Sequence, residues 1–269
     1  MNQLQSLQEE TWAFYAAHGR DLPWRQADDD GSYDPYKILV SELMLQQTQA
    51  ARVVPKYHEF LTRFPDVQSL AAAELGDVLR VWSGLGYNRR AKFLWQAAQA
   101  CLENFNGALP ADQKQLTELP GVGLNTAGAI CAYAFNMPVV FIETNIRTVF
   151  IHHLFPDRDQ VHDNELLPLV EQALDTENPR EWYWALMDYG SHIKATHGNA
   201  SRASAHHVKQ STFVGSKRQV RGQVLRALAQ GSQSLANLQE TIQDTRLETV
   251  LADLVGEGLI RHSGQDYSL

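Results

Sequence analysis

Residues 116–145 read LTELPGVGLNTAGAICAYAFNMPVVFIETN, and this stretch decides the fold of the chain. A turn through Gly121-Val122-Gly123 separates an apolar lead-in from a helical run of small residues. Glycine suits such a turn because it accepts positive φ and lets a ligand approach the backbone. The N–H groups at the start of the second helix can then hold a phosphate. The stretch predicts two helices joined by a glycine hairpin, although the GVG alone is equally typical of a plain αα-corner.

A carboxylate follows about twenty residues after the hairpin. Glu143 and Asn145 leave an apolar run, 139–142, and enter another helical pattern. An acid is thereby placed where it can face whatever the hairpin holds. Because a hairpin of this kind grips a phosphate backbone without reading a base, the pairing predicts an enzyme that works on nucleic acid.

Length and composition limit the other possibilities. With 269 residues, 44% of them hydrophobic, the chain can bury an ample core, and we expect two compact bodies with a small third. The net charge of −8 argues against indiscriminate nucleic-acid binding, which depends on Lys and Arg, so any DNA-binding face must be local. Cys101 and Cys131 have apolar neighbours and are expected to be buried thiols rather than a disulfide or metal site.

The sequence contains no apolar run of membrane-spanning length, and its first residues, MNQLQSLQEETW, lack the regions of a signal peptide. We therefore expect a soluble, cytoplasmic protein with no membrane partner.

A long helical pattern, PYKILVSELMLQQTQAARVVPKYHEFL, starts at Pro35. Glu42 lies on the same side of it as the apolar Leu39 and Met44. A lone Glu in such a place is more often exposed or capped. If Glu42 is buried instead, desolvation raises its pKa and makes it a proton donor at neutral pH.

The loop Ser83-Gly84-Leu85-Gly86-Tyr87 separates two further helical patterns and holds a Leu and a Tyr where neither is easily buried. Tyr87 either packs on the next helix or acts as a wedge that enters a base stack. The basic group Arg89-Arg90-Lys92 directly after it favours the wedge.

The chain becomes polar, small and basic over residues 194–216, which is typical of a linker or a phosphate-facing loop. His206 and His207 have no Cys or carboxylate at ligand spacing, so a metal site there is not favoured. From Lys217 the pattern is three short helices and a hairpin, which resembles a winged helix. A structural or partner-binding role competes evenly with reading of a DNA groove.

Residues 20 to about 195 resemble the helix-hairpin-helix (endonuclease III-like) DNA glycosylases, most closely the adenine DNA glycosylases that remove adenine mispaired with 8-oxoguanine. The motifs that carry the resemblance are RDLPWR, PYKILVSELMLQQTQ, WSGLGYNRRAK, LPGVGLNTAGAI, IETNIRTV and ALMDYG. It implies an all-α fold: a six-helix barrel (30–135), a second helical domain (1–29 plus 136–210) and a winged-helix-like tail (211–269). The flipped base would lie in the cleft between the first two, in a monomer bound to double-stranded DNA of the bacterial nucleoid.

The resemblance also implies site residues. Glu42 matches the general acid, which protonates adenine N7 so that the base departs neutral. The base pocket would comprise Arg20, Trp24, Arg25, Leu39 and Asp188, with Asp188 in place of the usual longer Glu. Contacts to DNA would come from Gln46, Gln47, Thr48, Leu85, Tyr87, Arg89, Arg90, Gly121, Val122, Gly123 and Asn145. The backbone carbonyls of Thr117, Leu119 and Val122 would hold a monovalent cation at the hairpin.

Two catalytic positions depart from the pattern of the family. Glu143 stands where the family has an Asp that stabilises the oxocarbenium-like sugar; the charge is kept, but the extra methylene moves it by about a bond length. Asn125 stands where bifunctional relatives carry a Schiff-base Lys. Because an amide nitrogen is not a nucleophile, we expect a glycosylase without lyase activity.

The third departure concerns the iron–sulfur cluster that the family usually holds with four cysteines. The corresponding positions are Lys194, Ser201, Ser204 and Gln210, so we expect no cluster, and we expect Lys194 to lie away from the flipped nucleotide. The family's domain for recognising 8-oxoguanine is also replaced by the short tail. Three hypotheses stay open: an adenine glycosylase without a cluster, a glycosylase for another base, and a non-catalytic DNA-structure binder.

Overall fold

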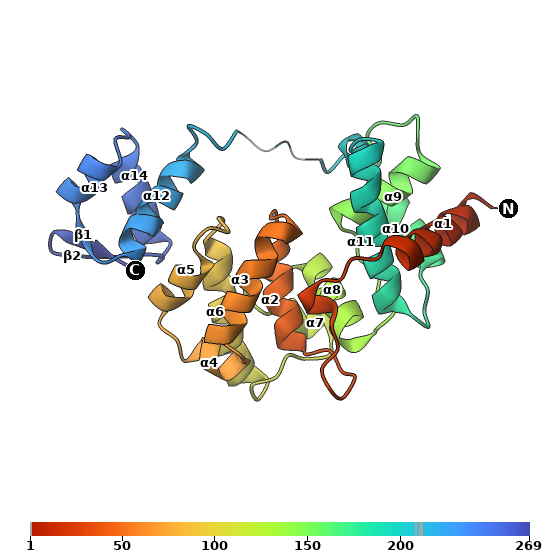
Figure 1. Ribbon diagram of the computed structural model, residues 1–269, viewed down its shortest axis with the longest axis horizontal. Coiled ribbons are helices and arrows are strands. Elements are labelled where there is room, and N and C mark those ends of the chain that lie inside the picture. Colours follow the sequence, from red (N-terminus) through yellow and green to blue (C-terminus); the bar gives the residue numbers. More distant parts are fainter. Residues whose placement is uncertain (1, 208, 210–211) are drawn as a thin grey trace. The chain divides into compact units, whose positions relative to one another are not determined.

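The computed structural model describes residues 2–207, 209 and 212–269, and these are mostly helical (Figure 1). The predicted all-α fold is thereby confirmed. The chain forms two compact units: unit 1 comprises residues 1–38, 111–117 and 122–209, and unit 2 comprises residues 39–110, 118–121 and 210–269. This division differs from the expected 30–135, 1–29 plus 136–210, and 211–269, because residues 30–38, 111–117 and 122–135 group with unit 1 and the tail groups with unit 2.

Unit 1 is built around the long helix α11 (Pro179–Thr196). Its elements are α1 (Gln3–His18), η1 (Pro23–Arg25), α7 (Gln113–Leu116), α8 (Leu124–Phe135), α9 (Thr144–Leu154), α10 (Asp163–Ala173), α11 (Pro179–Thr196) and η2 (Ala200–Ala203). Helix α11 packs on α9 and α1, and large side chains such as Trp182, Tyr183 and Phe150 are fully buried. A Cβ at Gly190 of α11 would come within 2.4 Å of the Asn145 carbonyl oxygen. Only glycine therefore lets α11 approach the start of α9 so closely.

The predicted hairpin is present as a local feature of the chain. Helix α7 ends at Leu116 and α8 begins at Leu124, with the glycine turn between them. Gly121 has φ +80°, and an added Cβ would lie 2.7 Å from the Cβ of Phe93, so glycine is required there for two reasons. Gly123 is the N-cap residue of α8 and has an extended backbone. A Cβ added there would meet no atom within 4 Å.

Helix α2 (Pro35–Leu45) begins in unit 1 and ends in unit 2. Unit 2 continues with α3 (Ala50–Arg63), α4 (Val67–Ala71), α5 (Leu75–Trp82) and α6 (Arg89–Asn104). Phe60, Trp82 and Leu94 are fully buried in it. The expectation that Leu85 resists burial is wrong, because Leu85 is 3% exposed. The indole Nε1 of Trp82 donates to the Gly86 carbonyl at 3.1 Å, which folds the loop back onto α5.

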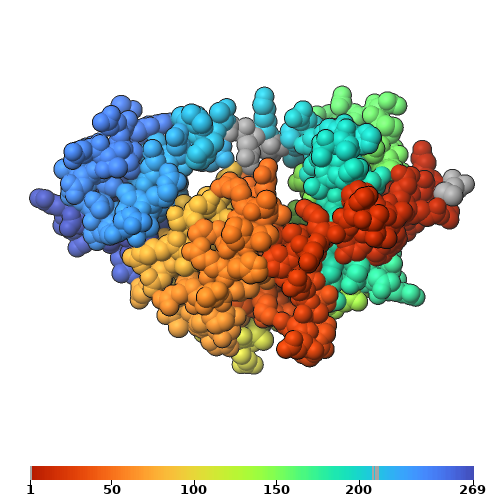
Figure 2. Space-filling view, in the orientation of Figure 1, coloured from red at the N-terminus to blue at the C-terminus, as the bar shows by residue number. Residues whose placement is uncertain are grey.

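The C-terminal residues form a small module within unit 2. It comprises α12 (Lys217–Ala229), β1 (Gln233–Ser234), α13 (Leu235–Thr241), α14 (Leu247–Gly256), β2 (Arg261–Ser263) and β3 (Asp266–Ser268). The strands form an antiparallel sheet in the order β1-β3-β2, which matches the predicted winged-helix arrangement. Helix α12 packs on α5, and Figure 2 shows the blue module against the yellow residues of that helix. Lys92 Nζ donates to the Glu257 carbonyl at 2.6 Å and adds a link from α6.

Within the described residues, no helix is both long enough and apolar enough to cross a membrane.

Candidate active site

Asp188 on α11 is held by two arginines from the start of unit 1. Its carboxylate accepts the backbone N–H of Arg20 at 2.8 Å and the Arg20 Nε at 2.7 Å. Arg25 adds a bidentate pair, Nη1 and Nη2, at 2.8 Å each. Burial raises the pKa of Asp188, but the hydrogen bonds and charges of Arg25 and Arg20 outweigh this and hold the pKa below its usual value. Asp188 is therefore an ionised carboxylate at neutral pH.

The structure thus brings together three of the five predicted pocket residues. The Asp188 side chain is 1% exposed, that of Arg25 is 7% exposed, and that of Arg20 is 38% exposed. Trp24, in η1, is buried. Leu39, which lies in unit 2, is also buried. The Asp188 cluster is held by mutual pairing, so its geometry favours a structural role, and contact with a base stays a prediction.

Glu143 is the N-cap residue of α9 and is half-buried. Burial raises the pKa of the Glu143 carboxyl, while the charges of Arg147 and Lys194 and the Thr144 backbone N–H lower it without cancelling the effect. Arg147 is engaged elsewhere, because its Nε and Nη2 donate to the two Asp163 oxygens at 2.8 and 2.6 Å. Among the described residues, no salt bridge is formed by Glu143. Glu143 is therefore a carboxylate whose charge is only partly compensated.

Lys194 lies beside this segment, and the expectation that it lies away from the flipped nucleotide stays a prediction. Its Nζ donates to the Asn145 Oδ1 at 2.6 Å, and its charge acts on Glu143. Burial lowers the pKa of Lys194, and the Glu143 charge opposes that effect. The Asn145 amide nitrogen points toward the Met187 sulfur at 3.6 Å. Sequence reasoning missed the contact with Asn145, because the resemblance placed Lys194 at a cluster-ligand position.

Asn125 lies exposed on the first turn of α8. Its Oδ1 accepts a long hydrogen bond of 3.4 Å from the backbone N–H of Ile142. The amide thus contacts the segment that leads to Glu143, within unit 1. The absence of lyase activity that we expect from Asn125 stays a prediction.

Glu42 is half-buried on α2, so it is neither fully exposed nor fully buried, the two alternatives that the sequence left open. Its helical neighbours Leu39, Leu43 and Met44 are fully buried. The helix ends at Leu45, and Gln47 has the left-handed φ of +57°. A non-glycine residue at positive φ is uncommon and marks a turn that the surrounding structure holds in place.

Arg90 holds the end of this helix. Arg90 is 7% exposed, and its guanidinium donates to the carbonyls of Leu43 and Met44, at 2.8 and 3.0 Å. It also donates to Thr48 Oγ1 and to the Gly86 carbonyl, at 3.1 Å each. Burial lowers the pKa of Arg90 to about 10, which leaves it a cation at neutral pH. Arg90 therefore joins the α2 terminus to the loop before α6, and its contact with DNA stays a prediction.

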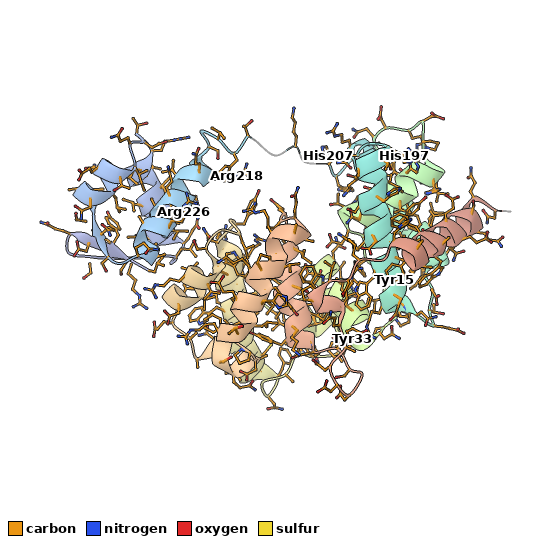
Figure 3. The ribbon with its side chains drawn as sticks, viewed as in Figure 1. Tyr15, Tyr33, His197, His207, Arg218 and Arg226 are labelled. Carbon is orange, nitrogen blue, oxygen red and sulfur yellow. The ribbon has the colours of Figure 1, made fainter. Side chains whose placement is uncertain are left out.

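Tyr87 has φ +47°, is half-buried and lies near two guanidinium groups. Those of Arg90 and Arg218 lie 5.4 and 5.6 Å from the ring centroid, and Arg218 Nη1 also donates to the Tyr87 hydroxyl at 2.6 Å. Arg218 lies at the start of α12 (Figure 3). Sequence reasoning missed this contact because it assigned the tail and the loop to separate bodies. The wedge role of Tyr87 stays a prediction, as do the DNA contacts of Gln46 and its neighbours.

The donor set does not fit an iron–sulfur cluster. Cys101 and Cys131 are buried, as predicted, and burial raises the pKa of each thiol to about 11, away from the thiolate that a cluster needs. Ser201 and Ser204 are buried hydroxyl residues, and Gln210 lies outside the described residues. In the described part of the chain, no group of three or more His, Cys, Asp or Glu could hold a metal ion. The predicted monovalent cation at the hairpin involves backbone carbonyls and stays a prediction.

Comparisons with known proteins agree with this arrangement. Residues 40–170 match the family model of the HhH-GPD superfamily of base excision DNA repair proteins. The adenine DNA glycosylase of Mycobacterium tuberculosis (strain CDC 1551 / Oshkosh) is 34% identical over 90% of this chain and 87% of its own length. That of Buchnera aphidicola subsp. Baizongia pistaciae is 35% identical over 67% of this chain, which spans only 50% of that relative. The structure of a thermostable thymine-DNA glycosylase matches with a TM-score of 0.63 at 23% identity, over 74% of this chain and 90% of that one.

Proposed function

Because the chain belongs to the adenine DNA glycosylases of the HhH-GPD superfamily, we propose that it hydrolyses the N-glycosidic bond of adenine mispaired with 8-oxoguanine or guanine in double-stranded DNA. The adenine leaves the base stack before the chemistry, at a cost of a few kcal/mol in lost stacking. Tyr87 and Gln46 fill the space that it vacates. The protein acts as a monomer on chromosomal DNA.

Glu42 is the general acid. It protonates adenine N7, so that the C1′–N9 bond breaks with a neutral base as the leaving group. The position of Glu42 supports this role, because it is a half-buried acidic residue on α2 whose neighbours Leu39, Leu43 and Met44 are fully buried. General acid catalysis of this kind typically contributes about 10²- to 10⁴-fold.

Glu143 stabilises the positive charge that develops on the sugar, after which water adds to C1′. One observation carries the proposal furthest: Glu143 is a half-buried carboxylate at a helix start and forms no salt bridge with any described residue. A partly compensated anion gains most from a cation that appears during the reaction. Asn125 supplies no amine, so the product is an intact abasic site. No metal cluster takes part, in keeping with the two buried thiols.

The test is single-turnover excision from a panel of duplexes, each with one mismatched or damaged base. The wild type should release adenine opposite 8-oxoguanine and guanine, leaving a site that breaks only after alkali. Glu42→Gln keeps the shape of the side chain but has no acidic proton, so it should lose excision by about 10²-fold or more while keeping affinity for the duplex. Excision of a different base would assign another substrate, and binding without excision of any base would leave a DNA-structure binder.

A further inference from the structure

We propose that Lys194 is a positioning residue of the active site, which holds the Asn145 amide from α11 and sets a positive charge beside Glu143. The proposal rests on the proposed function, in which Glu143 acts as an ionised carboxylate.

The geometry begins with one face of α11. Gly190 and Lys194 are four residues apart and therefore lie on the same side of the helix. Gly190 lets α11 approach the Asn145 backbone, where any Cβ would come within 2.4 Å of the carbonyl oxygen. One turn later, Lys194 Nζ reaches the Asn145 Oδ1 at 2.6 Å. His197, labelled in Figure 3, follows directly after the end of this helix.

The Asn145 amide is thereby fixed at both ends. Its oxygen accepts from Lys194, and its nitrogen points to the Met187 sulfur, three residues before Gly190 on α11. Asn145 lies two residues after Glu143, at the start of α9. Fixing this side chain therefore fixes the first turn of the helix on which Glu143 is the N-cap. Such a support matters for a catalytic group, because a small displacement from the productive geometry lowers the rate.

The charges around Glu143 single out Lys194. They come from Arg147 on α9 and Lys194 on α11, while α10 contributes Asp163, which binds Arg147. Arg147 thus shares its charge between two carboxylates. No salt bridge between Lys194 and a carboxylate is found in the described part of the chain, so the Lys194 charge remains available to Glu143. The residue that stands at a cluster-ligand position of the family here supports the catalytic carboxylate.

The first test is the pH profile of single-turnover adenine release by Lys194→Met, Lys194→Arg and the wild type. Glu143 must be ionised and Glu42 protonated, so the acidic limb reports Glu143 and the basic limb reports Glu42. We expect Lys194→Met to move the acidic limb to higher pH and leave the basic limb in place. The rate on the acidic side should fall about tenfold or more, since one pKa unit changes the ionised fraction tenfold. Lys194→Arg should stay near the wild type.

A matched control is Lys37→Met, which removes an amine of unit 1 that pairs with Asp28 on the surface. It should leave both limbs unchanged. A uniform fall of the Lys194→Met profile would contradict the proposal, because it would show a structural role alone. So would weaker DNA binding with a smaller salt dependence, which would make Lys194 a phosphate contact. Borohydride trapping of the abasic product on Lys194 would make it a nucleophile instead.

A second test needs no activity and so separates this proposal from the proposed function. Urea unfolding at pH 8 is measured for the wild type, Lys194→Met, Glu143→Gln and the double variant. We expect Lys194→Met to lower the midpoint more in the wild-type background than in the Glu143→Gln background, because only the former leaves an anion uncompensated. Additive effects would refute the contact between the two charges. A coupled pair in a protein that excises no adenine would refute the proposed function alone.

Discussion

Asp188 and Glu143 are two acidic side chains of unit 1 whose pKa values are shifted in opposite directions. Asp188 accepts from two arginines, and its pKa lies below the usual value. Glu143 shares Arg147 with Asp163 and has Lys194 nearby, and its pKa lies above the usual value. Burial raises the pKa of both groups, so the difference comes from their partners.

Asp188 and Glu143 therefore differ in how far their negative charge is already compensated. A carboxylate with two guanidinium partners has little left to offer a new cation, and removing it strands two positive charges. A partly compensated carboxylate destabilises the resting protein. The same carboxylate becomes stabilising when positive charge develops beside it during the reaction. We infer that Asp188 holds residues 20–25 against α11, whereas the negative charge of Glu143 stabilises the positive charge that develops on the sugar.

The largest effect is expected for Glu143→Gln. Loss of the charge should lower single-turnover adenine release by about 10²- to 10³-fold, the size typical of removing one electrostatic stabiliser of a transition state. The same change should raise the free energy of unfolding by about 0.5–2 kcal/mol, because it removes a poorly compensated anion. Excision kinetics and urea unfolding of one preparation check both. A fall in stability together with retained excision would show that Glu143 is a structural residue and not the stabiliser of the sugar cation.

Asp188→Asn should act mainly on stability. Breaking a buried ion pair from one side leaves uncompensated charge and typically costs about 3–5 kcal/mol. We expect a loss of that size in urea unfolding at pH 7, with excision partly retained at temperatures where the variant is folded. Full stability together with lost excision would instead make Asp188 a pocket residue, as the resemblance implied.

The sequence predicts the hairpin because its requirement is local: Gly121 must adopt positive φ whatever else the chain does. It also predicts the fold class, through helical periodicity and the motifs. It does not predict the burial of Leu85 and Arg90, because their partners come from α2 and from the folded loop. Lys194 is missed for a related reason, since only the packing of α11 on α9 brings its amine to Asn145.

A smaller effect separates the two arginines of the Asp188 cluster. The Arg25 side chain is 7% exposed and that of Arg20 is 38% exposed, although both donate to Asp188. Arg25→Met should cost about 3 kcal/mol, as for a buried pair, whereas solvent screens Arg20 and Arg20→Met should cost about 1 kcal/mol or less. Urea midpoints at low and high salt check this, and only the Arg20 effect should shrink in salt. Equal losses of stability in Arg25→Met and Arg20→Met would show that solvent exposure does not distinguish the two ion pairs with Asp188.

The most direct measurement is the free energy of unfolding of the wild type, Glu143→Gln and Asp188→Asn from pH 8 to pH 3. The folded-state pKa of Glu143 is raised, so its ionised form destabilises the protein above that pKa, and this destabilisation disappears as the pH falls toward the ordinary glutamate pKa of 4.5. The folded-state pKa of Asp188 is lowered, so its stabilisation is complete above 3.8 and is lost only as the pH falls through the folded-state pKa. We predict that the gain from Glu143→Gln shrinks between pH 8 and pH 4.5, while the cost of Asp188→Asn stays constant there and shrinks below pH 3.8. A gain that does not change with pH, or a cost that fades well above pH 3.8, would contradict the account.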